Sequence, residues 1–301
     1  MAVFDIIIPT YNNCAELRKC LLTLEHQIFT DFRVLICIDG STDDTLYFLK
    51  DYHPIFQIKI LQHDDGKNHG RNPARNLALP HIASEFILFI DSDIELRSDC
   101  LQRHYELLSK RDCISVGDVR YINTDTNIWA EYLQTRGKNK YRDGDEIPPQ
   151  YLITQNAAHR ARYFIEAGGQ DASMTLYGGG DTEYALRLFR HYHLPTIFNE
   201  CAAGDSAMNK TLSEALSQME RFGASNLKYL TKKYPENKDI FGLIYLQKTT
   251  FIGKAASLLF NKKLSLSIEK YIRLFPRKLQ KYAVHYCVAA RIHYGYNHTD
   301  I

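Results

Sequence analysis

Two aspartates placed two residues apart, Asp91 and Asp93, directly follow the apolar run 86–90. A run of this length, rich in aromatic and β-branched residues, is typical of a strand buried on both faces of a parallel sheet. The carboxylates would then emerge at the carboxyl edge of the sheet, where open α/β sheets bind ligands. They suit a hard divalent cation that takes its other ligands from water and a diphosphate. The alternative is that both aspartates only cap a helix beginning at Ser92 or Asp93.

Two further polar segments follow expected strands in the same way. Pro9–Asn12 comes after the strand-like segment 4–8, and Asp39–Asp43 comes after the segment 32–38. The ring of Tyr11 can lie on a nucleobase, and Asp39 can accept a hydrogen bond from the imide N–H of uracil, which cytosine lacks. These segments therefore indicate a nucleotide site, although a surface role for Tyr11 is the simpler alternative.

Two more segments carry residue types that suit a phosphorylated ligand. Arg71 and Arg75 lie in the loop and short helix before the fourth strand, where an arginine can pair with a diphosphate or hold an aspartate. Gly178–Gly180 is not followed by Gly-Lys-Ser/Thr, so it does not indicate a P-loop. The three glycines instead allow a close backbone approach and place Asp181 at the start of a helix, where a plain N-cap is one interpretation of it.

The elements that must position these residues alternate regularly. Strands expected at 4–8, 32–38, 55–61 and 86–90 are separated by helical segments, which predicts an α/β fold with a mainly parallel sheet flanked by helices. Beyond residue 95 we expect helices at 101–110, 129–133, 160–167 and 182–189, strands at 114–122 and 151–157, and a mobile loop at 136–146. From residue 211 onward the pattern is helical.

In their order and spacing, these motifs resemble those of the GT-A-fold glycosyltransferases of family two. The resemblance covers residues 3–205 and rests on Pro9–Asn12, Asp39–Asp43, Asp91–Asp93 and Gly178–Glu183. It implies a metal-dependent, inverting transfer of a hexose or N-acetylhexosamine from a nucleotide sugar, expected to be a UDP-sugar, to a hydroxyl of a glycan or lipid-linked acceptor. It also implies a GT-A domain at 1–205, with a nucleotide-binding half at 1–95 and an acceptor half at 96–205, and a helical extension at 206–301.

The resemblance assigns a role to each matched residue. Asp181 is implied as the general base, and Mn²⁺ or Mg²⁺ as the cofactor. Residues implied to hold the nucleotide sugar are Pro9, Thr10, Tyr11, Asn12, Asp39, Arg71, Asp91 and Ser92. Residues implied to hold the metal are Asp93 and Asp91, with Asp205 standing where relatives often have a histidine. Residues expected to contact the acceptor are Trp129, Asn156, Gly179 and Gly180, although a lone tryptophan is as often a core residue.

Three departures from the family pattern keep other functions open. Ile38 and Gly180 stand where the family commonly has acidic residues, and the expected histidine is missing near Asp205. A non-catalytic nucleotide-sugar-binding module is therefore one alternative. A sugar-phosphate nucleotidyltransferase is another, but Pro9–Asn13 lacks the glycine-rich basic loop that this class needs.

The charge of the chain is distributed unevenly. From Ser206 onward there are 16 Lys and Arg against 6 Asp and Glu, whereas residues 1–205 carry 21 against 29. Basic helices with apolar stripes predict peripheral contact with an anionic membrane on its inner face, or else packing or dimerisation. No nucleic-acid-binding motif is present. Seven cysteines without a Cys-x-x-Cys pair, and no signal-like N-terminus, lead us to expect a cytoplasmic protein with reduced thiols.

Overall fold

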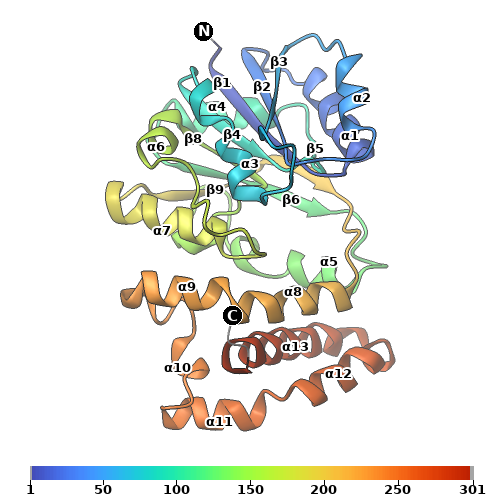
Figure 1. Ribbon diagram of the computed structural model, residues 1–301, viewed down its shortest axis with the longest axis vertical. Helices are drawn as coiled ribbons and strands as arrows, with labels where there is room; N and C mark the ends of the chain where they lie inside the picture. Colours follow the sequence, from blue (N-terminus) through green and yellow to red (C-terminus); the bar gives the residue numbers. More distant parts are fainter. Residues whose placement is uncertain (1, 299–301) are drawn as a thin grey trace. The chain divides into compact units, whose positions relative to one another are not determined.

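The strand-like segments at the start of the chain form the parallel half of one sheet in the computed structural model, which describes residues 2–298 (Figure 1). β1 (Phe4–Thr10) pairs in parallel with β2 (Phe32–Ile38) and β4 (Phe86–Ile90), and β2 pairs in parallel with β3 (Gln57–Gln62). Because these strands run in one direction, the residues that follow β1, β2 and β4 meet at one edge of the sheet. The predicted gathering of Tyr11, Asp39 and Asp91 has this topological cause.

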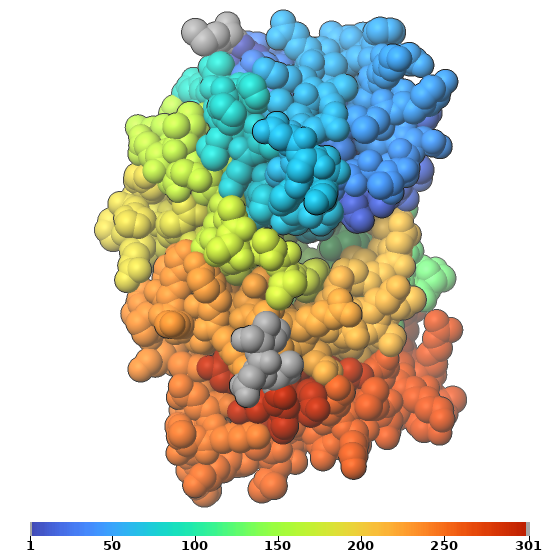
Figure 2. Space-filling model, viewed as in Figure 1, coloured from blue at the N-terminus to red at the C-terminus, as the bar shows by residue number. Residues whose placement is uncertain are grey.

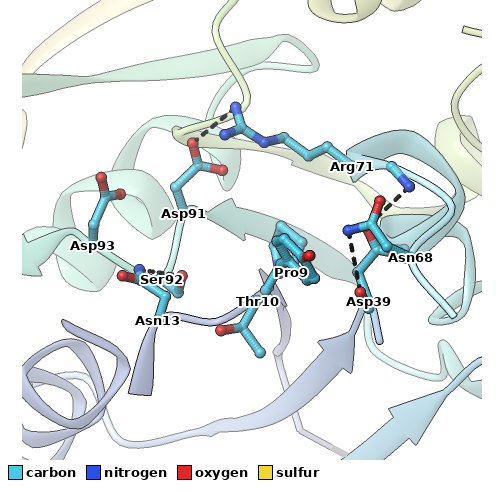
Figure 3. A pocket seen from close by; sticks show the side chains of 12 residues that line it. Pro9, Thr10, Asn13, Asp39, Asn68, Arg71, Asp91, Ser92 and Asp93 are labelled. Atoms are coloured by element: carbon cyan, nitrogen blue, oxygen red, sulfur yellow. Dashed lines mark hydrogen bonds and ion pairs between the residues drawn. The ribbon is translucent and has the colours of Figure 1, made fainter. Parts of the chain in front are cut away.

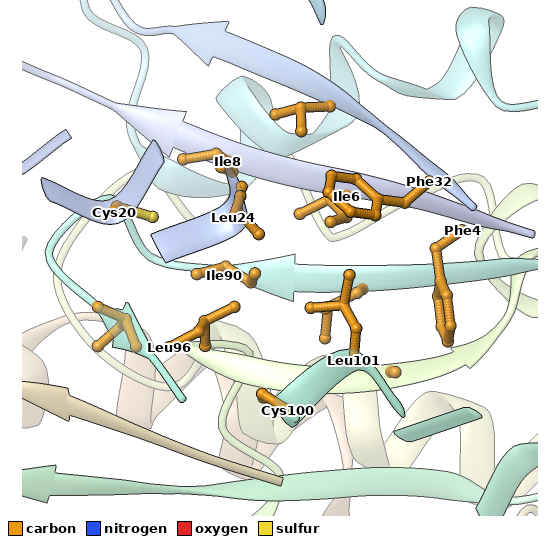
Figure 4. Close-up of a cluster of buried hydrophobic side chains, with 14 of the residues drawn as sticks. Phe4, Ile6, Ile8, Cys20, Leu24, Phe32, Ile90, Leu96, Cys100 and Leu101 are labelled. Carbon is orange, nitrogen blue, oxygen red and sulfur yellow. The ribbon is translucent and has the colours of Figure 1, made fainter. Parts of the chain in front are cut away.

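β1 is buried on both faces, so its alternate residues enter two different cores. Ile6 and Ile8 pack with α1 (Cys14–Glu25) and α4 (Cys100–Leu108) in the cluster drawn in Figure 4. Ile7 lies in the second cluster, with side chains from α6 (Ala161–Glu166) and α7 (Gly180–Tyr192). Helices thus cover both faces of the sheet, as expected for an α/β fold.

The sheet continues beyond β4 with strands that lie far apart in the sequence. The strand order of the described residues is β3-β2-β1-β4-β8-β6-β9-β5, and β7 also pairs with β9. β8 runs antiparallel between β4 and β6, whereas β6 and β9 are parallel with a bulge at Gly117/Asp118. The bounds of these strands are β5 Glu95–Leu96, β6 Ile114–Tyr121, β7 Glu146–Ile147, β8 Asn156–Arg160 and β9 Thr196–Ser206.

Two local predictions are wrong. The strand expected at 151–157 lies at Asn156–Arg160, because Pro149–Tyr151 forms a 3₁₀ turn that delays it. The charged stretch 136–146, expected to be a mobile loop, includes a 3₁₀ turn at Gly137–Lys140 in which Lys138 is buried. Its Nζ atom lies 2.9 Å from the Asp118 carboxylate, and this buried ion pair fixes the segment.

Short helices complete the loops around the sheet. They are α2 (Thr45–Lys50), α3 (Arg71–Asn76) and the 3₁₀ turn at Leu79–His81.

The chain divides into two units. The first comprises 1–122, 137–175 and 180–207, and the second comprises 123–136, 176–179 and 208–301. The main division thus falls two residues after the predicted boundary at 205, but two short segments from the predicted catalytic region join the second unit. The helices of the second unit are α5 (Ile128–Gln134), α8 (Leu212–Ala224), α9 (Asn226–Lys233), α10 (Leu243–Leu246), α11 (Phe251–Leu259), α12 (Lys262–Tyr271) and α13 (Arg277–His298).

The second unit has its own core. α8 begins with a capping box formed by Thr211 and Glu214, and its Leu216 packs with Val284 of α13. The buried Arg291 of α13 pairs with Glu220 and Glu269 at 3.0 and 2.7 Å. None of the described helices combines the length and the apolar composition needed to cross a bilayer.

Candidate active site

A cavity of about 290 Å³ opens at the carboxyl edge of the parallel strands. Figure 3 shows Asp39 and Asn68 on one side of it and Asp91 and Asp93 on the other, with Pro9 and Thr10 between them. Its polar lining and its place at the strand ends suit a nucleotide ligand. The residues that line the cavity are Pro9, Thr10, Tyr11, Asn13, Asp39, Asn68, Gly70, Arg71, Ala74, Asp91, Ser92 and Asp93.

The end of β1 offers two groups that suit a nucleoside. The side chain of Tyr11 is half exposed beside the cavity, so its ring is available for stacking on a flat base. The hydroxyl of Thr10 is buried and, within the described residues, has no hydrogen-bond partner. Because an unpaired buried hydroxyl is costly, a ligand group that hydrogen-bonds to Thr10 would stabilise the complex.

Asp39 lines the cavity and also anchors its rim. Its Oδ1 accepts a hydrogen bond from the backbone N–H of His69 at 2.7 Å, and its Oδ2 accepts one from Gly70 at 3.0 Å. Each carboxylate oxygen can accept a second bond, so the predicted contact with a uracil N–H is compatible with this geometry. The sequence did not indicate that Asp39 would also position the loop 68–70.

Asn12 lies outside the cavity lining, contrary to the prediction that it holds the nucleotide. Its backbone is left-handed, with φ of 46°, and its Oδ1 accepts a hydrogen bond from the backbone N–H of Thr42 at 2.7 Å. The neighbouring Asn13 lines the cavity instead and donates to Ser92 Oγ at 3.0 Å. Asn12 therefore ties the loop after β1 to the loop after β2.

Asp91 and Asp93 lie in a turn after β4 that leads to the short strand β5. The next helix, α4, begins only at Cys100, so the alternative that the two aspartates cap a helix is wrong. The pKa of the Asp93 carboxyl is raised to about 6, first by burial and then by the charge of Asp91, while Arg71 acts in the opposite direction. The negative charge of an ionised Asp93 is therefore not balanced by the positive charges around it. A divalent cation bound beside Asp93 would balance this charge.

Asp205 does not join this pair. It lies on β9 opposite Glu95 and outside the cavity lining, and no three His, Cys, Asp or Glu side chains of the described residues are grouped closely enough to hold a metal. The prediction of Asp205 as a third ligand is therefore wrong. Two carboxylates fit an ion that takes its remaining ligands from water and a diphosphate.

We expect the affinity for Mn²⁺ to depend on pH through Asp93. With a raised pKa, the carboxyl is ionised above about pH 6 and protonated below it, and a proton then competes with the metal. Affinity should thus fall by about tenfold for each pH unit below this point. Titration of the protein with Mn²⁺, followed by electron paramagnetic resonance at about pH 5 and pH 7, measures this change. Asp93→Asn should bind weakly at both values, and an equal pH dependence in this variant would contradict the assignment.

Arg75 connects the cavity to Asp181. Its guanidinium is almost completely buried and contacts Asp91 Oδ1 at 2.7 Å and Asp181 Oδ1 at 3.8 Å. Gln170 Oε1 accepts a further hydrogen bond from Arg75 Nη1 at 3.2 Å. A single guanidinium thus separates the carboxylate of the expected metal site from the carboxylate of the expected base. The sequence indicated that an arginine of this segment could hold an aspartate, but it did not indicate the link to Asp181.

Asp181 lies in the first turn of α7 and is about one-third exposed. Its Oδ1 accepts a hydrogen bond from the hydroxyl of Thr154, which is fully buried. Arg75 and Thr154 both approach Oδ1, so the other carboxylate oxygen is left to receive a proton. No feature of the sequence singled out Thr154, because it lies in an irregular segment.

Removing Arg75 should destabilise the fold strongly. We expect Arg75→Met to lower the free energy of unfolding by about 3–5 kcal/mol, because Asp91 and Asp181 would lose the cation between them. Urea unfolding monitored by circular dichroism measures this effect. Arg71→Met is the matched control: the Arg71 side chain is 61% exposed, so its pairing with Asp91 should contribute less than about 1 kcal/mol. Equal losses in the two variants would contradict the role given to Arg75.

The three glycines before α7 have different physical roles. Gly178 and Gly179 adopt left-handed backbones, with φ of 88° and 81°. At Gly180 a Cβ would lie 2.7 Å from Asn72 Oδ1, so the Asn72 side chain occupies the space that the family's acidic residue would need. Contact of Gly179 and Gly180 with an acceptor remains a prediction.

The segment that leads to these glycines is held by α9. Asn226 Nδ2 donates to the carbonyl oxygens of Leu176 and Gly178 at 2.8 and 2.7 Å. Because the side chain of Asn226 is buried, these bonds fix the path of the chain three residues before Asp181. No sequence pattern indicated this contact between segments about fifty residues apart.

Two residues expected to contact the acceptor are core residues. Trp129 is buried in the second unit and stacks on Tyr132, with ring centroids 5.2 Å apart, so no face of the indole is open to a sugar. Asn156 is also buried: its amide donates to the carbonyl oxygen of Ala202 at 2.8 Å, and its Oδ1 contacts His104 Nε2 at 2.9 Å. Burial lowers the pKa of His104 to about 4, so this ring is neutral and structural.

Comparison with protein families agrees with this fold. The family model described as Glycosyl transferase family 2 matches residues 5–167, more than half of the chain. The chain therefore belongs to glycosyl transferase family 2.

Curated relatives match parts of the chain. Chondroitin synthase from Escherichia coli is 25% identical over 220 residues, which are 62% of this chain and 32% of that protein. The poly(ribitol-phosphate) β-N-acetylglucosaminyltransferase TarS from Staphylococcus aureus is 35% identical over 104 residues, 34% of this chain and 18% of TarS. A GalNAc(5)-diNAcBac-PP-undecaprenol β-1,3-glucosyltransferase from Campylobacter jejuni is 29% identical over 156 residues, 52% and 49% of the two chains. The chain thus spans less than half the length of each relative.

Solved structures show the same fold. A mannosyltransferase from Pyrobaculum calidifontis, in complex with GDP-mannose and Mn²⁺, gives a TM-score of 0.65 at 17% identity and covers 96% of this chain and 86% of its own. TarS 1–349 from S. aureus, in complex with UDP-GlcNAc, gives 0.55 at 16% identity and covers 96% and 89%. The predicted GT-A fold, with its mixed, mainly parallel sheet and flanking helices, is confirmed.

Proposed function

We propose that this protein is an inverting glycosyltransferase that moves a sugar from a UDP-sugar to a hydroxyl of a glycan or lipid-linked acceptor, with Mn²⁺ or Mg²⁺ as cofactor. The observation that carries this proposal is the arrangement around Arg75. A carboxylate pair, Asp91 and Asp93, borders the cavity at the carboxyl edge of the parallel strands, and a third carboxylate, Asp181, lies on the other side of one guanidinium.

The donor side of the mechanism follows from the cavity. Tyr11 stacks on the base, Thr10 supplies its unpaired hydroxyl, and Asp39 accepts the uracil imide N–H. When bound, the divalent ion would be held by Asp91 and Asp93 and would neutralise charge on the departing diphosphate. Arg71, which is close to Asp91, adds a positive charge at the same side of the cavity.

The acceptor side rests on Asp181. The carboxylate receives the proton of the acceptor hydroxyl while the hydroxyl oxygen attacks the anomeric carbon from the face opposite the diphosphate, and this in-line attack inverts the configuration. Arg75 and Thr154 orient the base through Oδ1.

The acceptor class draws support from relatives. The C. jejuni relative is named for a glycan linked to undecaprenol, and TarS is named for poly(ribitol-phosphate), a polymer of anionic units. The excess of positive charge after Ser206 supports work on such acceptors at the inner, anionic face of a membrane. We therefore extend the proposal to peripheral association with that surface from the cytoplasm.

A competition experiment tests the donor assignment. We expect UDP to bind more tightly than GDP, because Asp39, which lines the cavity, can accept a hydrogen bond from the uracil imide N–H and the ring of Tyr11 suits a small flat base. Displacement of a fluorescent UDP analogue by unlabelled UDP, GDP and dTDP, in the presence of Mn²⁺, measures the order of affinity. Tighter binding of GDP or dTDP would contradict the uridine assignment. Tight UDP binding with no turnover of any donor would favour the non-catalytic binding module.

A further inference from the structure

Helix α11 buries its small residues and exposes its large apolar ones. Gly253 and Ala256 face inward, and a Cβ at Gly253 would lie 1.8 Å from the carbonyl oxygen of Gln247, so the inner side of the helix is packed against backbone. Phe251 and Leu258 are 87% and 86% exposed, and Leu259 is 62% exposed. A surface helix in a soluble protein normally shows the reverse pattern. The exposed side of α11 therefore presents an apolar surface that an apolar partner could cover.

Helix α12 presents leucine between cations on its outer side. Lys263, Leu266 and Lys270 recur at helical spacing and are exposed, whereas Ser265 on the opposite side is buried against Arg291. Arg273 and Leu274, both exposed, extend the same mixture beyond the helix. We call the exposed residues Phe251, Leu258, Leu259, Lys263, Leu266 and Lys270 the α11–α12 face.

The two helices belong to the outer layer of the second unit. α12 packs against α13, and α11 packs against α10, while α13 packs mainly against α8. Figure 1 draws α11 and α12 along the same side of α13, and the space-filling view of Figure 2 shows atoms of this segment at the surface of the second unit. Scattered exposed leucines are ordinary in proteins, but a group of them on two consecutive helices indicates a binding surface.

The charged residues after Phe251 indicate which kind of partner can bind the α11–α12 face. After Phe251 the sequence holds nine Lys and Arg but only two acids, Glu269 and Asp300. Glu269 pairs with the buried Arg291 at 2.7 Å, and Asp300 lies outside the described residues. A second copy of this chain would thus bring lysines against lysines, which opposes association. A bilayer with anionic headgroups complements both the apolar side chains and the cations.

We propose that the α11–α12 face rests on an anionic membrane. Phe251, Leu258 and Leu259 enter the boundary between headgroups and acyl chains, while Lys263 and Lys270 contact anionic headgroups. Each cation near the surface contributes about 1 kcal/mol of attraction. No described helix can span the bilayer, so this contact is interfacial and sensitive to salt. The proposal defines the surface of the peripheral association proposed above and does not require that the cavity turn over a donor.

Vesicle co-sedimentation of the full chain tests this surface. We expect pelleting with phosphatidylcholine vesicles that contain phosphatidylglycerol at low salt, release at high salt, and little pelleting with phosphatidylcholine alone. The double variant Phe251→Ser/Leu258→Ser and the double variant Lys263→Glu/Lys270→Glu should each lower partitioning by at least about tenfold. Since all four side chains are exposed, circular dichroism should show that both variants fold as the parent does.

Two matched control variants distinguish binding through the α11–α12 face from non-specific binding to vesicles. Ile55→Ser removes a side chain that is 79% exposed in the first unit, and Lys232→Glu reverses an exposed charge on α9; both should pellet like the parent protein. Absence of pelleting by the folded parent protein at low salt would overturn the proposal. So would a dimer in analytical ultracentrifugation that Phe251→Ser/Leu258→Ser abolishes, because the face would then belong to a second copy. Donor turnover measured in the same variants without vesicles should equal that of the parent, so a failure here is distinguishable from a failure of the proposed reaction.

Discussion

Asp93→Asn is expected to lower the turnover of a UDP-sugar by at least about a hundredfold, which corresponds to about 2.7 kcal/mol of transition-state stabilisation. An amide is a weaker ligand for a hard cation than a carboxylate, and the charge that develops on the departing diphosphate would lose part of its neutralisation. Initial rates of UDP release with saturating Mn²⁺ measure the effect. The fold should be unaffected, because the raised pKa of Asp93 shows that ionising this carboxylate is unfavourable in the metal-free protein.

Asp205→Asn is the matched control for this experiment. Asp205 was expected from the sequence to be a third metal ligand, but it lies on β9 outside the cavity, so its amide should leave the rate and the metal requirement nearly unchanged. A similar loss in both variants would show that the metal is held differently from the arrangement described here. Full activity of Asp93→Asn would remove Asp93 from the metal site altogether.

Asp181→Asn is expected to lower sugar transfer by about 10²–10⁴-fold while leaving the affinities for UDP and Mn²⁺ close to those of the parent. The substitution keeps the shape of the side chain and removes the proton acceptor. Asp181 does not line the cavity, which is why nucleotide binding should survive. Calorimetric titration with UDP, alongside transfer rates with an acceptor, separates the two effects.

Thr154→Val provides a graded comparison, because it removes only the hydroxyl that orients Asp181. We expect a smaller fall in the transfer rate than in Asp181→Asn, again with UDP binding retained. If Asp181→Asn lost UDP binding in proportion to activity, Asp181 would belong to the donor site and not to the acceptor side.

The sequence could predict the parallel half of the sheet and the residues at its edge. The segments that become β1, β2 and β4 are almost entirely apolar, because both of their faces are buried, and this pattern is visible without any tertiary information. Since parallel strands end at one edge, the polar residues after each strand had to meet. Tyr11, Asp39 and Asp91 accordingly line one cavity.

Side-chain contacts between segments far apart in the chain could not be predicted from the sequence in the same way. Arg75 stands in a short polar helix that resembles a solvated helix start, and only the folded chain shows that it is buried between carboxylates 16 and 106 positions away. Trp129 and Asn156 failed as acceptor residues for the same reason, since long-range packing decides whether an aromatic or amide side chain is exposed. A signal existed for Trp129, because Tyr132 and Leu133 follow it at the spacing of a buried helix face.

The most direct test of the central claim is a donor-turnover assay on the intact chain. Candidate UDP-hexoses and UDP-N-acetylhexosamines would each be incubated with the protein and Mn²⁺, and UDP release would be followed by phosphorus magnetic resonance with and without excess EDTA. The proposed function predicts UDP release from at least one of these donors, its loss in EDTA and its recovery when Mn²⁺ or Mg²⁺ is restored. Undiminished turnover in excess EDTA, or no release from any UDP-sugar by the folded protein, would contradict a metal-dependent UDP-sugar transferase.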